Sequence, residues 1–217
     1  AVAAQPPPLA AAVDTRAENR LFDPTDPIDL SGVPGVTDQE QERAEALLSS
    51  TMESLPRFAD HQAAIDAGYQ SLGDAFTGHE HLVNWDLLDD GRTLDAAYPE
   101  SLVYAVDDDG NRSLASAMYM LTPGSRLTTV PAVGGSLTPW HVHENICVTT
   151  DLATPTEGGI TDASGACSPG QELFSPVPML HVWVTPHPCG PFASLESVAG
   201  LEVGEDEIVF CDHIHGA

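Results

Sequence analysis

From about residue 101 onward, the sequence consists of short β-prone runs separated by glycine and proline. The runs "SLVYAV" and "SLASAMYML" flank the segment "DDDGNR", and this arrangement predicts a β-hairpin. Four further runs have the same character, at residues 127–133, 142–149, 179–184 and 207–211. Many short strands behind turn residues are typical of a barrel or a sandwich, so we expect a mainly β fold.

The N-terminal part of the chain differs from this β-like part. Prolines recur through residues 1–36, which predicts an extended arm that wraps the domain or a neighbouring subunit, or else a spacer. The segment "TDQE", which begins at Thr37, is a capping box, and apolar residues at helical spacing follow it. A shorter helix is expected at residues 59–67, with Gly68 as the residue that ends it.

These signals divide the chain into an arm and one domain. The length of 217 residues suits a single domain plus appendages. We expect a Pro-rich arm at residues 1–36 and a domain at residues 37–217. In that domain, helices at about 37–67 would precede a β-barrel at about 101–217.

The charge balance excludes several classes of partner. The chain has 33 acidic side chains against seven arginines and no lysine, for a formal net charge of -26. Nucleic acid and anionic membranes bind through basic surfaces, so neither is an expected partner. No apolar run approaches the ~20 residues that cross a bilayer, so we expect no membrane insertion. The start "AVAAQPPPLA" resembles a mature N-terminus left by a signal peptidase, which predicts a secreted or extracellular protein. A start chosen for expression would look the same.

Four cysteines fit the same oxidising setting. They are Cys147, Cys167, Cys189 and Cys211, and an even number in an exported chain predicts two disulfides. Three pairings are possible, and sequence order favours Cys147–Cys167 and Cys189–Cys211 because each closes a short loop. Thiolate ligation of a metal is the competing interpretation, although no C-x-x-C pair occurs.

Nine histidines are unevenly distributed, and three of them suggest a metal site. Alternate residues of a strand share a face, so His141 and His143 would point the same way, and Glu144 the other way. His181 lies inside "MLHVWV", where a buried imidazole needs a partner. Together the three imidazoles would form a three-histidine site with an open fourth position. Ordinary hydrogen-bonded histidines are the alternative.

Other histidines are candidates for that fourth position. His81 precedes "LVNW" in a stretch that we expect to be a loop, and it could supply the fourth ligand. Its neighbour His79 competes for the same role. His213 and His215, near the C-terminus, are expected to be exposed.

The spacing around these residues resembles the two cupin motifs. Gly135 is followed after five residues by His141 and His143, as in the first motif. Gly170, Pro176 and His181 have the spacing of the second motif. This resemblance covers residues 135–185 and implies metal ligation by His141, His143 and His181 inside a β-barrel.

The match has departures that bear on the metal. The glutamate that follows the histidines of the first cupin motif has no counterpart in "ICVTT". The second motif has glycine where this chain has Pro178 and asparagine where it has Thr185. The fourth ligand therefore stays open.

A second resemblance runs from about Leu30 onward. The phrases "GHEHLVNW", "PESLVYAV", "SAMYML", "WHVHENIC", "MLHVWV" and "HPCGPFA" are similar to a group of uncharacterised, exported actinobacterial proteins. That resemblance implies export and a single unit, but no activity.

Imidazole ligands suit zinc, copper, iron and nickel, and an oxidising setting favours copper or zinc. Met179 shares the predicted face of His181, and Met118 and Met120 share a face of another strand. Thioether sulfur beside imidazole favours copper over zinc, while core filling is the alternative role of these methionines.

Three functions follow from these expectations. The first is a protein that holds or delivers copper or zinc outside the membrane. The second is a metal-dependent enzyme, such as an oxidoreductase, that uses the open coordination position. The third is a structural subunit stapled by metal and disulfides, which forms a homo-oligomer through residues 1–36. We rank metal binding first because it needs the fewest additional residues.

Overall fold

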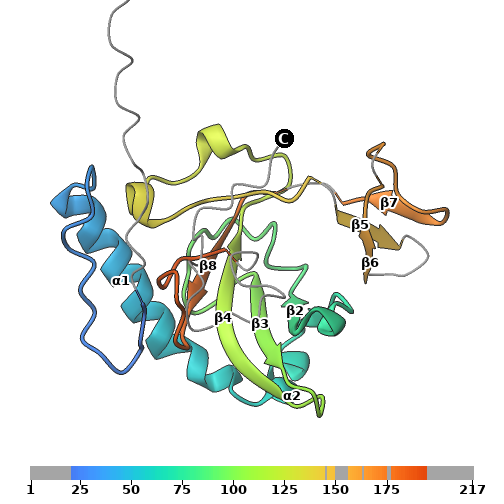
Figure 1. The fold of residues 1–217 in the computed structure, drawn as a ribbon, viewed down its shortest axis with the longest axis horizontal. Coiled ribbons are helices and arrows are strands. Elements are labelled where there is room, and N and C mark those ends of the chain that lie inside the picture. The colour runs from blue at the N-terminus through green and yellow to red at the C-terminus, as the bar shows by residue number, and fades with distance from the viewer. Residues whose placement is uncertain (1–20, 145, 150–155, 163, 175–176, 195–217) are drawn as a thin grey trace, which may run out of the picture.

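The computed structural model describes residues 21–144, 146–149, 156–162, 164–174 and 177–194 (Figure 1). It is mainly β with N-terminal helices, as the sequence predicts. The helices are α1 (Asp38–Ser54), η1 (Leu55–Phe58), α2 (His61–Asp66), η2 (Ala75–Thr77), η3 (Leu127–Thr129) and η4 (Gly135–Leu137). The strands are β1 (Gln70–Ser71), β2 (His79–Val83), β3 (Ser101–Val106), β4 (Arg112–Met120), β5 (Ile146–Thr149), β6 (Thr156–Ile160), β7 (Gln171–Leu173) and β8 (Met179–Trp183).

Both predicted helices near the N-terminus are present. The capping box that precedes α1 is formed in both directions: Thr37 N donates to Glu40 Oε2 at 2.9 Å, and Glu40 N donates to Thr37 Oγ1 at 3.3 Å. The side chain of Asp60 caps α2. Gly68 follows α2 with a φ of 94°, a left-handed conformation that suits glycine.

A five-stranded antiparallel sheet forms the centre of the molecule, in the order β1-β2-β3-β4-β8. Side chains alternate between its two faces. The helix face carries Leu102, Tyr104, Ala117, Tyr119, Leu180 and Val182. The histidine face carries His79, His81, Ser101, Val103, Ser116, Met118, His181 and Trp183.

The helix face packs against the N-terminal helices. Its tyrosines use their hydroxyls there: Tyr119 Oη lies 2.7 Å from Thr51 Oγ1 of α1, and Tyr104 Oη donates to the carbonyl of Phe58 in η1 at 2.6 Å. Leu48, on the buried side of α1, and Leu180 of β8 are both fully buried. This side of the sheet is therefore an ordinary hydrophobic core with satisfied polar groups.

The bulge in the main sheet, together with the 6.0 Å between the rings of His81 and His181, indicates that the sheet curls towards its histidine face. A bulge interrupts the pairing of β3 with β4: Val103 pairs with Ser116, but Tyr104 pairs with Leu114, so Ala115 is an extra residue. A bulge of this kind bends its strand and increases the local twist. In the middle of this face, Val103 pairs with Ser116 and Ser101 pairs with Met118, so two of these four residues are serines.

A second, three-stranded sheet with the order β6-β5-β7 stands apart from the main sheet (Figure 1). The predicted disulfide Cys147–Cys167 lies here and is confirmed, with a Cα–Cα distance of 5.6 Å. Cys189 is also disulfide-bonded. Its predicted partner, Cys211, lies outside the described residues, as do His213, His215 and the β-like run at 207–211.

The expected barrel is not closed in the part of the chain that the structure describes. The outer edge of β8 does not pair with β1; it forms an isolated bridge with His141, in which His141 N donates to Met179 O and Met179 N donates to His141 O. These two hydrogen bonds occupy the edge that closure would require. The described strands therefore form two open sheets.

Two of the predicted strands are also wrong in their bounds. Residues 127–133 contain the short helix η3 instead of a strand, and Pro131, which lacks an amide hydrogen, follows it. The strand predicted at 142–149 begins only at Ile146. By contrast, the predicted strands at 101–106, 113–121 and 179–184 correspond closely to β3, β4 and β8.

The described part of the N-terminal arm, residues 21–36, lies against its own domain. Phe22 is buried and forms a bridge with His187, with hydrogen bonds of 2.9 Å in both directions. Leu30 N donates to the Glu45 side chain in α1 at 2.9 Å. Among the described residues, there is no helix with the length and apolarity needed to cross a membrane.

Candidate metal centre

Four histidines from three parts of the chain gather over the histidine face of the main sheet. His81 comes from β2, His181 from β8, and His141 and His143 from the segment before β5. The ring centroids of His141 and His181 are 5.4 Å apart, as are those of His141 and His143. The ring of His81 lies 6.0 Å from that of His181. The structure thus brings together all four predicted ligand residues, which we call the imidazole cluster.

The curl of the sheet makes this convergence possible. In the sheet order, β2 and β8 are three strand spacings apart, which is about 14 Å in a flat sheet. The 6.0 Å between the rings of His81 and His181 is less than half of that. Two of the four residues on this face between the histidines, Ser101 and Ser116, are small, which favours a lean of the two imidazoles over the middle of the face.

His181 occupies the centre of the imidazole cluster. It is 1% exposed, and its Nδ1 has no hydrogen-bond partner among the described residues. Burial lowers the pKa of His181 well below its usual value, and the neighbouring His141 and His81 lower it further. The ring is therefore neutral at ordinary pH, which is the form that binds metal ions.

His81 is held in a defined orientation by Asp74, which precedes η2. The Asp74 carboxylate accepts the His81 backbone amide at 2.9 Å and lies 2.5 Å from the His81 Nδ1. Asp74 is 2% exposed. When Nδ1–H donates to this carboxylate, the lone pair of the neutral ring is on Nε2. A carboxylate behind a histidine is the usual support of a metal-ligating imidazole.

His141 has the same tautomer preference through a weaker contact. Its Nδ1 lies 3.3 Å from the carbonyl oxygen of Pro139, and its backbone is fixed by the bridge to Met179. His143 is half-buried beside it, and Glu144 is exposed. The predicted reason for the pairing of His141 and His143, strand alternation, is wrong because neither residue lies within a strand ladder. The loop nevertheless places the two rings together.

A second aromatic group lies beside the cluster on the same face. The Trp183 indole stacks on His187 at 4.4 Å and meets His79 edge-on at 5.9 Å. His187 Nδ1 accepts the backbone amide of Cys189, so the proton of the neutral ring is on Nε2. Burial, followed by the nearby His79, lowers the pKa of His187 to about 4. His187 therefore has no lone pair to offer a metal ion unless it breaks this contact. His79 lies by Trp183, and of these two histidines only His81 has a hydrogen bond to Asp74 among the described residues.

Three buried methionines border the cluster. Met118 of β4 pairs directly with His181, and Met120 pairs with Met179, so all three methionines share the face of His181. Directly paired residues in an antiparallel sheet have Cβ atoms about 4.5–5.5 Å apart. Thioether sulfur is thus close to the imidazole cluster.

Sequence reasoning missed Asp74 and misassigned the segment around His81. The alternation in "HEHLV" is a strand signal that could have identified β2. No local signal connects Asp74 to His81, because the turn of η2 brings them together. Among the described residues, no group of three or more histidine, cysteine, aspartate or glutamate side chains is arranged so that it could hold a metal ion. Comparisons of the chain with protein-family models, curated proteins and solved structures find no match.

Proposed function

We propose that this chain binds one transition-metal ion in the imidazole cluster, through His81, His141, His143 and His181. The observation that carries the proposal is a buried, neutral His181 with rings of the three other histidines 5–6 Å from it or from one another. The buried Nδ1 of His181 has no hydrogen-bond partner among the described residues, and a metal ion shared with the neighbouring rings would satisfy such a nitrogen.

The known separations of the rings are close to those expected around a shared ion. Metal–nitrogen bonds of about 2.0–2.1 Å in a tetrahedral arrangement put the centroids of two ligating rings about 5 Å apart. Two of the three measured separations are 5.4 Å and the third is 6.0 Å. The rings of His141 and His181 are stacked at an interplanar angle of 15°, so binding would require the side chains to rotate until their nitrogens point at one ion.

The chemistry of the neighbours favours copper over zinc. Both metals accept imidazole, but thioether ligands prefer copper, above all in its Cu(I) state. Met118 and Met179 adjoin His181 in β4 and β8. We therefore propose that the protein holds or delivers copper, and that the disulfide Cys147–Cys167 suits it to an oxidising, extracellular setting.

The experiment is a metal titration of the chelator-treated protein, with stoichiometry read by elemental analysis after desalting. The native chain is expected to retain one copper ion, with weaker retention of zinc. His141→Ala should remove most of the bound metal, because it deletes a ligand and leaves the backbone bridge to Met179 intact.

The control is His61→Gln, since His61 lies on the helix side of the sheet, where it contacts Glu80 and Tyr104. This variant should keep full stoichiometry. Full occupancy in His141→Ala, or equal losses in the two variants, would contradict the proposal.

A further inference from the structure

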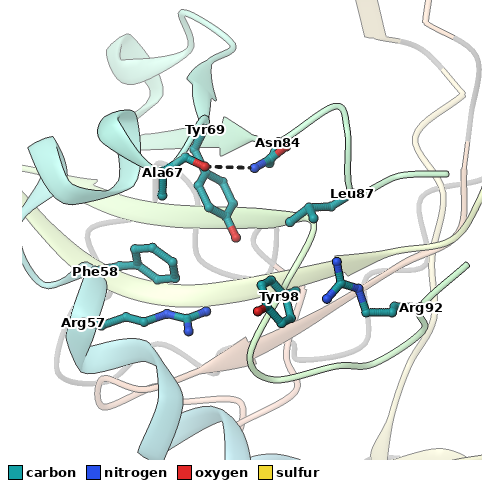
Figure 2. Close-up of a pocket in the computed structure, with 8 residues that line it drawn as sticks. All are labelled: Arg57, Phe58, Ala67, Tyr69, Asn84, Leu87, Arg92 and Tyr98. Carbon is teal, nitrogen blue, oxygen red and sulfur yellow. Dashed lines mark hydrogen bonds between the residues drawn. The ribbon is translucent and has the colours of Figure 1, made fainter. Parts of the chain in front are cut away.

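We propose that a second site, independent of the imidazole cluster, binds a small organic carboxylate with a planar apolar body. The site is a pocket of about 380 Å³ near η1, α2 and the connection between β2 and β3 (Figure 2). It is lined by Arg57, Phe58, Ala67, Tyr69, Asn84, Leu87, Arg92 and Tyr98. None of the four histidines of the cluster lines it.

The charges around the pocket are unusual for this chain. Acidic side chains outnumber arginines by 33 to seven, yet two of the seven arginines line this pocket and no acidic residue does. Among the described residues, the Arg57 guanidinium forms no ion pair; its Nη2 donates to the carbonyl of Ala97. The remaining N–H groups of Arg57 are donors without a carboxylate, at an exposed position beside an apolar space.

Arg92 and Tyr98 form the opposite rim. The Arg92 guanidinium lies 3.8 Å from the centroid of the Tyr98 ring, and Arg57 lies 5.8 Å from the same ring (Figure 2). Arg92 donates Nε to Asp90 at 2.8 Å and also interacts with the side chain of Tyr98, so Arg57 is the guanidinium without a carboxylate partner among the described residues. The two guanidiniums thus border the pocket on either side of one aromatic ring, a combination that attracts planar anions and repels cations.

The floor of the pocket offers no competing polar group. Phe58 and Tyr69 pack edge to face with centroids 5.3 Å apart. The Tyr69 hydroxyl donates to Pro99 O at 2.6 Å, and the Asn84 side chain is used by Ala67 O and by the amide of Asp86. An apolar, largely aromatic floor therefore lies below guanidinium donors.

This pattern specifies the class of ligand. A guanidinium presents two parallel N–H groups, which match the two oxygens of a carboxylate. The apolar floor would take an aromatic or similarly flat body, and the volume is within the range of small-molecule sites. The positive rim and the absence of a lining carboxylate make a cationic ligand unfavourable.

The test uses 4-fluorobenzoate as the probe and the neutral 4-fluorobenzamide as its matched control, with binding to the full chain followed by fluorine NMR. The acid should bind at least tenfold more tightly than the amide, because only the acid makes charge-assisted hydrogen bonds. Arg57→Met should weaken binding of the acid about tenfold and leave binding of the amide nearly unchanged. Arg57 is exposed, so this change should not prevent folding.

Arg126→Met is the control variant, since Arg126 lies outside the pocket and its side chain is not among the lining residues. It should bind the acid as the native chain does. Three results would each overturn the proposal. The first is equal affinity for the acid and the amide, and the second is an equal loss of affinity in the two arginine variants. The third is no binding of the acid at about 10 mM probe, a concentration that detects weak millimolar binding.

Discussion

The two faces of the main sheet are built to different rules. On the helix face, the buried hydroxyls of Tyr104 and Tyr119 are paired with Phe58 and Thr51. On the histidine face, the hydroxyls of Ser101 and Ser116 are buried and have no hydrogen-bond partner in the part of the chain that the structure describes. The buried Nδ1 of His181 is in the same condition. The tyrosine hydroxyls of the helix face are therefore satisfied, whereas the histidine face has buried polar groups without partners, whose burial lowers stability.

This difference teaches how stability and function are divided in the molecule. Burial of Leu180 and Val182 against the helices stabilises the fold whatever else is bound. On the other face, the buried Nδ1 of His181 lowers stability unless a ligand satisfies it. Because alternate residues of one strand serve the two faces, β8 allows the two roles to be compared at neighbouring positions.

The largest expected effect on stability comes from substitutions in β8, which test the difference between the two faces. Leu180→Ala should destabilise the chain by about 2–5 kcal/mol, with or without metal, because it opens a cavity in the helix face. His181→Ala also opens a cavity, but it removes an unsatisfied buried group, so it should destabilise the metal-free protein less than Leu180→Ala does. It should instead abolish the stabilisation of about 2.7 kcal/mol that a metal at a hundred times its Kd gives the native chain.

Chemical denaturation of both variants, with and without copper, measures these differences. If His181→Ala destabilises the metal-free protein as much as Leu180→Ala does, the two faces are not distinct in the way described. If copper stabilises His181→Ala as well as the native chain, the ion does not depend on the histidine face.

Glu100, on the helix side, is a buried ionisable group and is thus an exception to the satisfied, apolar character of that side. It is 2% exposed, its Oε2 accepts the backbone amide of Met120 at 3.1 Å, and burial raises its pKa to about 7. Since the folded state holds this proton more tightly than the unfolded state, the stabilisation is present below pH 4.5 and is lost as the pH rises through 7. Glu100→Gln should therefore stabilise the protein by about 2–3 kcal/mol at pH 8 and change little at pH 4.

Unfolding free energies at the two pH values test this sign. Gln can still accept the Met120 amide, so the variant isolates the charge. An equal effect at pH 4 and pH 8 would mean that the carboxylate of Glu100 is not the cause.

The smallest expected effect concerns Asp74, whose Oδ1 and Oδ2 serve the backbone and ring of His81. Asp74→Asn that keeps its oxygen on the backbone amide presents an NH₂ group to His81 Nδ1, which moves the ring proton to Nε2 and removes the lone pair there. Copper affinity should fall tenfold to a hundredfold. Glu144→Gln, an exposed acid near the cluster, is the matched control and should change the affinity little.

Competition with a chelator of known affinity measures the Kd of these two variants. The assigned role of Asp74 fails if Asp74→Asn and Glu144→Gln bind copper with the same affinity.

Features that depend on neighbouring residues could be predicted from the sequence. The capping box at Thr37 specifies the start of α1, and the "DDDGNR" turn specifies the hairpin of β3 and β4. The disulfide Cys147–Cys167 followed from the order of the cysteines. In each case, the residues that decide the structure are close together in the chain.

Features that depend on distant contacts could not be predicted. His141 and His143 were assigned to a strand by alternation, but the edge of β8 holds His141 by its backbone alone. The approach of His81 to His181 depends on the curl of four strands, and Asp74 reaches His81 through the turn of η2. The sequence therefore identified the residues of the imidazole cluster better than the way they meet.

The extra residue in β4, Ala115, has a consequence for how the cluster responds to its occupant. Its carbonyl accepts the amide of Val184 at 2.9 Å, so a hydrogen bond connects the bent part of β4 to the residue that directly follows β8. An ion bound by residues of both β2 and β8 would link the two strands across the curved face, and it would oppose any motion that flattens the sheet. Binding of the ion and the curvature of the sheet would then be coupled. The backbone motions of the sheet should therefore be smaller when the ion is bound than when it is absent.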